Sequence, residues 1–144
     1  MSQVMQKEAT SMADVEIGTI FYASWGYDQT NIEFYKVIRK TATMVELRAI
    51  GQIYVESASS MSEYVMPDPE NELFKSDYMT RAEAQEKGYK IIKETEGSES
   101  VCAEYPEITK HKVNFKYGQA SVKFASYKYA SIFDGRPKLQ SHWA

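Results

Sequence analysis

The first candidate for chemistry in this sequence is a polar, aromatic stretch that runs from Trp25 to Asn31. Asp28, Gln29 and Asn31 supply hydrogen-bond donors and acceptors. Trp25 and Tyr27 add flat apolar rings, so the stretch could bind a ligand or a partner with these rings as stacking platforms. Alternatively, Asp28 and Asn31 cap a turn through bonds to nearby backbone, and Trp25 covers the end of a barrel as an apolar plug. The sequence leaves both interpretations open.

A second group of candidate binding residues lies in the C-terminal segment, which is basic and rich in aromatic residues. From residue 108 to residue 144 the chain carries seven basic side chains and one acidic side chain, Asp134. Lysines between aromatic rings on a sheet face are typical of proteins that bind single-stranded nucleic acid. A solvated strand face opposite a core of tyrosine and phenylalanine would have the same composition. The candidate contact residues here are Lys123, Lys128, Tyr129 and Arg136.

The rest of the chain is acidic, which gives a net charge of -3 and argues against broad, nonspecific affinity for nucleic acid. Halves of opposite charge favour either an acidic segment that lies against a basic one or a basic face kept for a polyanion. A third interpretation is that acidic side chains of the middle segment imitate phosphates and occupy the DNA site of a host enzyme. The residues that would do so are Glu63, Asp68, Glu70, Glu72 and Asp77.

Thiol, imidazole and carboxylate side chains are too scattered to indicate an active site. Cys102 is the only cysteine, and the two histidines, His111 and His142, lack the paired spacing of zinc sites. The seven glycines are spread along the chain and form no phosphate-binding loop. We therefore expect no catalytic residue, no cofactor and no metal. The alternative is a small enzyme, or a nucleotide- or small-molecule-binding domain, that uses Trp25–Asn31 as a pocket.

Apolar runs on both sides of the polar stretch predict the strands that position it. Ile17–Ser24 and Ile32–Arg39 are rich in β-branched and aromatic residues, and the second run has apolar residues on both faces, as a central strand does. Met44–Ile50 follows after a short polar break and should pair with it as an antiparallel hairpin. Further on, Pro67 and Pro69 predict a loop.

The strongest helix signal lies between Thr80 and Gly88. Thr80 and Glu83 have the spacing of a capping box, and Gly88 can adopt the left-handed conformation that ends a helix. After the helix, the pattern predicts a hairpin around Gly118 and a bulge or sharp bend near Ala125–Ser126. The predicted fold is α+β with β dominant, a twisted antiparallel sheet or small open barrel with one short helix.

The length of 144 residues is typical of one domain, and we expect residues 15–144 to form it behind a flexible N-terminal tail, residues 1–14. No apolar run approaches the roughly 20 residues that cross a bilayer, and residues 1–14 lack the apolar stretch of a secretory signal. The lone Cys102 suits a reducing compartment. These features lead us to expect a cytoplasmic protein with no membrane contact, and they leave the oligomeric state open.

Both ends of the chain resemble a family of small, uncharacterised phage and mobile-element proteins. The opening signature of that family is similar to Tyr22–Tyr35, with the sequence YASWGYDQTNIEFY. Its closing signature is similar to Val122–Pro137, although tryptophan is common in the family where Phe133 stands. The acidic middle, Glu56–Glu107, has no counterpart. The resemblance implies a phage or plasmid setting and a role in the cytoplasm of an infected bacterium, and it brings no activity with it.

These observations lead to one hypothesis about function. The protein is expected to be a non-catalytic phage or mobile-element accessory protein that binds a macromolecular partner, either nucleic acid or a nucleic-acid-processing or defence complex of the host. If the chain ends meet in space, the turn at Asp134–Arg136 would lie beside the polar stretch and form one composite site with it.

Overall fold

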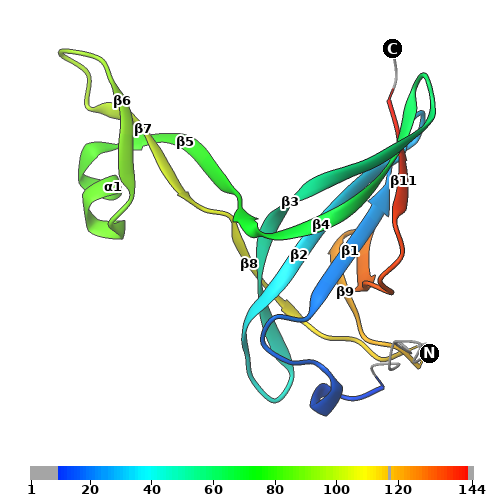
Figure 1. Ribbon diagram of the computed structural model, residues 1–144. Coiled ribbons are helices and arrows are strands. Elements are labelled where there is room, and N and C mark those ends of the chain that lie inside the picture. Colours follow the sequence, from blue (N-terminus) through cyan, green and yellow to red (C-terminus); the bar gives the residue numbers. More distant parts are fainter. Residues whose placement is uncertain (1–9, 117, 143–144) are drawn as a thin grey trace.

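The computed structural model describes residues 10–116 and 118–142, and they form a single β-dominant domain of antiparallel strands, as predicted. Figure 1 shows a curved sheet from which a smaller arm projects. The spatial order in the curved sheet is β11-β4-β3-β2-β1-β10-β9, and β8 pairs with β3. Its strands are β1 (Ile20–Trp25), β2 (Asn31–Lys40), β3 (Met44–Ser59), β4 (Ser62–Glu72), β8 (Ile108–Lys112), β9 (Ser121–Ala125), β10 (Lys128–Ile132) and β11 (Lys138–Ser141).

Both faces of the central strand β2 are buried, which confirms the prediction from its two apolar faces. Tyr35 and Val37 belong to the larger core, together with Phe21 of β1 and Leu47 of β3. Ile32 and Phe34 point the other way, into a second core that includes Val65. The residues of β2 alternate between these two cores because successive side chains of a strand face opposite sides of the sheet.

The sheet curls around the larger core but does not close into a barrel. On one side β8 pairs with Met44–Arg48, the start of β3, and on the other β9 forms the edge beyond β10. The two edges approach where His111 Nδ1 lies 3.2 Å from the carbonyl oxygen of Lys123 and where a single bridge joins Asn114 to Ser121. β9 therefore lies where the two edges of the curved sheet come close together.

The loop that Pro67 and Pro69 predict is not there, because both prolines lie within β4. β4 pairs with β11 only over Ser62–Val65, so the backbone beyond Val65 needs no donor on that side. Proline, which has no N–H group, is tolerated at such an edge. On its other side β4 continues to pair with β3, where Pro67 stands opposite Gln52.

The arm is a three-stranded sheet in the order β5-β7-β6, with the helix α1 packed on one face (Figure 1). The helix prediction is confirmed: the Thr80 hydroxyl accepts a bond from the backbone N–H of Glu83, and Gly88 is left-handed with a φ of 71°. Ala84 of α1 is buried against Val101 and Ala103, which form the arm's own small core. The elements of the arm are β5 (Phe74–Thr80), α1 (Arg81–Lys87), β6 (Lys90–Glu94) and β7 (Ser100–Pro106).

Three backbone hydrogen bonds form the junction between the arm and the curved sheet, where the chain enters the arm at Leu73 and leaves it at Glu107. Leu73 N–H donates to the carbonyl of Ala49, Ala49 N–H to that of Glu107, and Glu107 N–H to that of Leu73, at 3.0, 3.0 and 3.1 Å. Arg48, which is buried, adds a bond from Nε to the Leu73 carbonyl and lies 4.8 Å from the centre of the Phe74 ring. The two segments that connect the arm to the curved sheet, at residues 73 and 107, are thus both bonded to Ala49 of β3.

Two further segments, the N-terminal tail and the turn after β9, can be compared with the sequence predictions. Of the tail expected for residues 1–14, residues 1–9 lie outside the described part, whereas Met12–Asp14 forms the 3-10 helix η1 and Met12 packs against the larger core. The Lys40 ammonium donates to the carbonyls of Met12 and Val15, so this part of the expected tail is folded. The bend predicted near Ala125–Ser126 is a tight hairpin turn between β9 and β10.

Candidate functional site

The polar stretch Trp25–Asn31 forms the turn between β1 and β2. Tyr27 is fully exposed and Asp28 is exposed as well, while Gln29 Nε2 donates to Asn31 Oδ1 over 3.0 Å. The turn depends on Gly26, which has a φ of +133° and stands where an added Cβ would lie 1.9 Å from the carbonyl oxygen of Gln29. The stretch is therefore held by its own backbone, with Tyr27 and Asp28 presented to solvent.

Gly26→Ala should cost about 2 to 3 kcal/mol of the free energy of unfolding, because the new Cβ would collide with backbone in a conformation that strongly favours glycine. Gly97 provides the control, since it is also left-handed (φ +81°) but has open space around the added Cβ. Gly97→Ala should cost only about 1 kcal/mol, the penalty of the left-handed backbone itself. Chemical denaturation of both variants measures the difference, and equal losses would show that the Trp25–Asn31 turn is not as tight as described.

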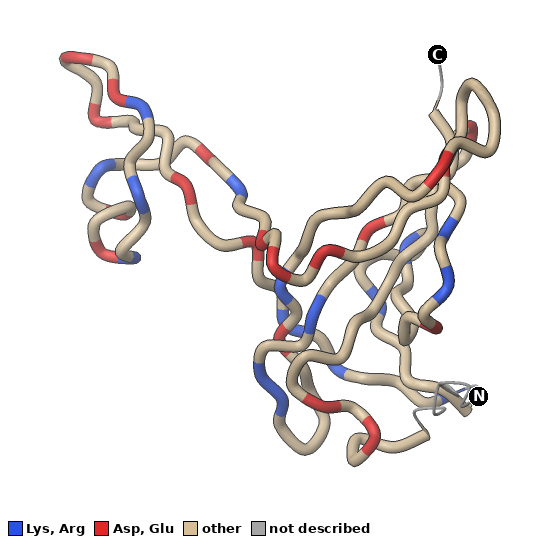
Figure 2. The backbone as a smooth tube through the Cα atoms, in the orientation of Figure 1, with Lys and Arg blue, Asp and Glu red and all other residues tan. Residues whose placement is uncertain are grey.

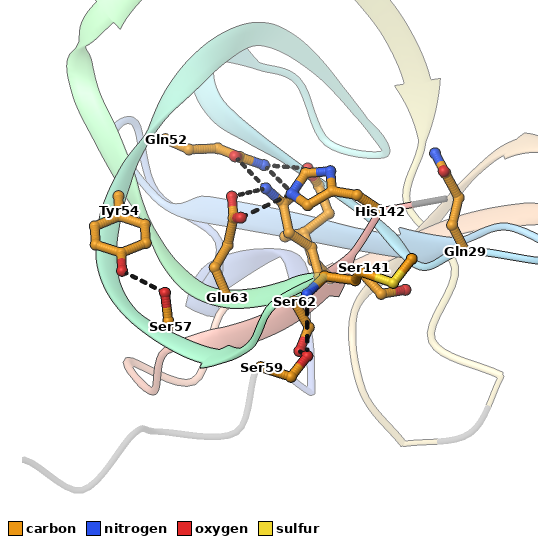
Figure 3. A network of polar contacts seen from close by, with 12 residues as sticks. Gln29, Gln52, Tyr54, Ser57, Ser59, Ser62, Glu63, Ser141 and His142 are labelled. Atoms are coloured by element: carbon orange, nitrogen blue, oxygen red, sulfur yellow. Dashed lines mark hydrogen bonds and ion pairs between the residues drawn. The ribbon is translucent and has the colours of Figure 1, made fainter. Parts of the chain in front are cut away.

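The C-terminal end of β11 is fastened to this turn. Thr30 N–H donates to the Ser141 hydroxyl over 2.8 Å, and Ser141 N–H donates to the Thr30 carbonyl over 3.0 Å. The two residues that flank Ser141 belong to a polar network (Figure 3). In it, Glu63 of β4 accepts bonds from Gln140 at 2.9 Å and from His142 at 2.7 Å. Hydrogen bonds from Gln140 and His142 hold the pKa of the Glu63 carboxyl below its usual value. The polar stretch thus borders β11, which is bonded in turn to β4.

The expected composite site of the polar stretch and the Asp134–Arg136 turn does not form. Phe133 N–H donates to the carbonyl of Ile20, at the start of β1, whereas the polar stretch follows Trp25, at the end of the same strand. β11 then runs from the Asp134–Arg136 turn toward the polar stretch, so the strand separates the two. Arg136 is exposed, and its backbone N–H bonds to Asp134 in a local turn.

Trp25 and Lys128 come together with Glu33 in a cluster at one end of the larger core. Trp25 Nε1 donates to Glu33 Oε2 at 3.2 Å, and the Tyr35 hydroxyl donates to Glu33 Oε1 at 2.7 Å. The Lys128 ammonium pairs with Glu33 and lies 4.6 Å from the centre of the Phe124 ring. Trp25 also packs against the core, as the plug interpretation predicts. Because the Lys128 side chain is largely buried and paired with Glu33, it is not a free surface cation.

Opposing effects set the protonation states in this cluster. Burial raises the pKa of Glu33, but hydrogen bonds from Lys128, Tyr35 and Trp25 and the charge of Lys128 outweigh it, so that the carboxyl stays below its usual value. Burial and then the neighbouring Glu33 carboxylate raise the pKa of the Tyr35 phenol well above its usual value. At neutral pH Glu33 is therefore a carboxylate, and Tyr35 is a neutral phenol that donates to it.

Lys123 and Tyr129 lie on the outer face of the same hairpin, in a hollow of about 630 Å³. They stand directly opposite each other on β9 and β10, next to the facing pair Ser121 and Ser131. Tyr129 is 51% exposed, and Lys123 has no ion-pair partner among the described residues. We call this surface the basic hollow, and its lining residues are Asn114, Lys116, Ser121, Lys123, Tyr129 and Ser131.

Three residues of the basic hollow, Asn114, Ser121 and Ser131, were not indicated by the sequence, and Lys116 was indicated only as one of the basic side chains of the C-terminal segment. Ser121 lies two residues before Lys123 on β9, and Ser131 lies two residues after Tyr129 on β10. Because every second side chain of a strand points to the same face, this spacing could have identified both serines. Asn114 joins the hollow through its bridge to Ser121, a contact that residue spacing does not reveal. Lys116 follows Asn114, whose Oδ1 accepts its backbone N–H at 2.7 Å.

The charge asymmetry of the sequence is partly neutralised within the fold. Lys128 pairs with Glu33 and Lys138 with Asp134, so two basic side chains of the C-terminal segment have acidic partners. In the middle segment, acidic and basic residues are interspersed along the arm (Figure 2). Three of the five carboxylates considered as phosphate mimics are bound by this chain's own side chains, which weakens the mimic interpretation: Glu63, Glu72 and Asp77.

Comparisons with protein-family models, with curated proteins and with solved structures found no match. Among the described residues, no helix has the length and apolar character needed to cross a membrane. The geometry of the basic hollow is therefore the observation from which a function can be argued.

Proposed function

We propose that this chain is a non-catalytic binding protein whose partner is single-stranded nucleic acid, held in the basic hollow. The observation that carries this proposal is the juxtaposition of Lys123 and Tyr129 on adjacent strands, one without an acidic partner among the described residues and the other half exposed. A ring of that kind offers a stacking surface for any base, and a neighbouring ammonium offers a contact for the adjoining phosphate. Together they supply the two contacts that sequence-tolerant binding requires.

The size and lining of the hollow support a nucleotide-sized occupant. Its volume of about 630 Å³ falls within the usual range for ligand sites, roughly 300 to 1,000 Å³. Asn114, Ser121 and Ser131 add short polar side chains that can bond to a base edge or a sugar hydroxyl. Because the hollow lies on the outer face of β9 and β10, a strand of nucleic acid can continue past it along the surface.

The net charge of -3 limits the affinity that this surface can reach. Long-range attraction to a polyanion is absent, so binding depends on local contacts and should be modest. The phage or mobile-element setting and the host cytoplasm that we propose for this activity rest on the resemblance of Tyr22–Tyr35 and Val122–Pro137 to that family. In this setting the partner would be nucleic acid of the phage or host, or a complex that carries it.

An oligonucleotide titration tests the proposal. Fluorescence anisotropy with a labelled oligo(dT) should detect binding at about 50 mM salt that weakens about sevenfold at about 200 mM, if two lysines each contact one phosphate of a single strand. Tyr129→Leu should weaken binding about tenfold, because stacking contributes roughly 1 to 3 kcal/mol per base. Tyr27→Leu, a change at a fully exposed tyrosine of the Trp25–Asn31 turn, should have no effect.

Two results would contradict the proposal. Absence of binding at the lower salt concentration would exclude nucleic acid as the partner of the basic hollow. A loss of affinity in Tyr27→Leu that matches the loss in Tyr129→Leu would place the contact at the turn instead.

A further inference from the structure

We propose that a second hollow, on the arm, binds a cationic side chain, lysine or arginine, of a partner protein. This hollow has a volume of about 370 Å³ and lies between α1 and strand β5. Three tyrosines and two carboxylates dominate its lining: Tyr78, Tyr89, Tyr105, Asp77 and Glu83. Aromatic faces next to acidic groups attract organic cations, because both the ring quadrupole and the carboxylate favour positive charge.

Two of the tyrosines, Tyr89 and Tyr105, form a stacked platform. Tyr89 and Tyr105 stack with their centroids 4.7 Å apart and their planes 20° from parallel. The Tyr105 hydroxyl donates to Asp77 Oδ2, which fixes the carboxylate beside the stacked pair. This bond, followed by burial, raises the pKa of Tyr105 to about 12, so the phenol remains a donor at neutral pH. Tyr78 also lines the hollow and is 71% exposed.

A cation of this chain already lies at the platform. Lys87 Nζ stands 5.8 Å from the centre of the Tyr89 ring and 3.7 Å from Glu83 Oε2. Both side chains of this pair are about half exposed, at 50% and 47%, so the pair contributes little and water or another cation can replace it. Counting Asp77, Glu83 and Lys87, the lining carries a net charge of -1, which leaves room for one further positive group.

The position of the hollow suits a protein partner. The arm projects away from the curved sheet, and its far end lies well apart from β9 (Figure 1). A partner that inserts a lysine or arginine beside Tyr89 would therefore not obstruct the basic hollow. This inference is independent of the proposed nucleic-acid binding, because it involves different elements and the opposite sign of charge.

A titration with a tetra-arginine peptide, followed by amide NMR shifts of the full chain, tests this inference. The shifts should cluster at Asp77–Tyr89 and at Tyr105. Glu83→Gln should weaken peptide binding about threefold to fivefold, which corresponds to the loss of one exposed electrostatic contact. Lys87→Ala should strengthen it by a similar factor, because the competing ammonium is removed. Glu96→Gln, a charge-matched change in the loop between β6 and β7, should leave it unchanged.

Lys87→Ala is interpreted together with the two glutamate variants, since a more negative arm would by itself also favour the cationic peptide. Unchanged or weaker binding in Lys87→Ala would overturn the inference. So would an equal loss in Glu83→Gln and Glu96→Gln, which would indicate nonspecific attraction between the peptide and the acidic arm. Dispersed amide signals of the arm in each variant confirm that the fold is retained.

Discussion

Lys123→Glu should weaken oligonucleotide binding about tenfold or more at low salt, because the change removes an ammonium from the basic hollow and places a carboxylate beside the phosphates. Lys123 is exposed on β9, opposite Tyr129, and no ion pair within the described residues depends on it. The fold should therefore tolerate the substitution, with a change in the free energy of unfolding below about 0.5 kcal/mol. A less drastic change, Lys123→Gln, should reduce the slope of log affinity against log salt by about 0.7.

The control for this prediction is Lys75→Glu, which makes the same change in net charge on the arm. Lys75 is exposed on β5, and β5 belongs to the three-stranded sheet of the arm rather than to the curved sheet. If attraction to the whole molecule dominated, both variants would lose affinity equally. A local contact in the basic hollow predicts a large loss in Lys123→Glu and a small loss in Lys75→Glu, as measured by anisotropy.

Glu33→Ala should lower the free energy of unfolding by about 2 kcal/mol at neutral pH. Removal of the carboxylate leaves the Lys128 ammonium, only 15% exposed, without its partner, and it deprives Trp25 Nε1 and the Tyr35 hydroxyl of their acceptor. Breaking a fully buried ion pair costs about 3 to 5 kcal/mol, and the smaller value here reflects the 36% exposure of the Glu33 side chain.

The pH dependence of this loss follows from the lowered pKa of Glu33. Because the folded-state pKa lies below the unfolded value, near 4.5, the carboxylate stabilises the fold above that pH, and the stabilisation is lost as pH falls through the folded pKa. The difference between the original chain and Glu33→Ala should therefore shrink in acid. Urea denaturation at pH about 7 and about 3.5 measures it. Glu56→Ala, at an exposed position of β3, is the control. A loss in Glu33→Ala no larger than in Glu56→Ala would contradict the account of the cluster.

Local patterns were sufficient to predict the elements whose signals lie within a few residues. Thr80, Glu83 and Gly88 indicated the short helix, and the two apolar faces of Ile32–Arg39 indicated a central strand. The extension of β4 through Pro67 could not be predicted in this way, because it depends on where β11, which is more than 60 residues further on, stops pairing. The helix of the arm was predicted, but the assembly of β5, β6 and β7 into a separate sheet was not, because β5 and β6 are largely exposed and carry little apolar alternation.

The sequence alone did not show which candidate residues face the core and which face solvent. Lys128 and Tyr129 are neighbours in the chain, yet one faces the core and the other faces solvent. Their assignment depends on the tight turn after β9 and on a register shift between Lys128 and Tyr129, which composition does not reveal. The polar network around Glu63 joins residues about 80 positions apart, so no local motif could have indicated it.

The most direct test of the central claim is an NMR titration of the isotope-labelled full chain with oligo(dT). If nucleic acid occupies the basic hollow, the largest amide shifts should fall on Ser121, Lys123, Tyr129 and Ser131, while those of the arm should stay unchanged. Shifts concentrated at Trp25–Asn31 would move the binding site to the turn between β1 and β2, and a spectrum without any shift at low salt would remove nucleic acid from the account altogether.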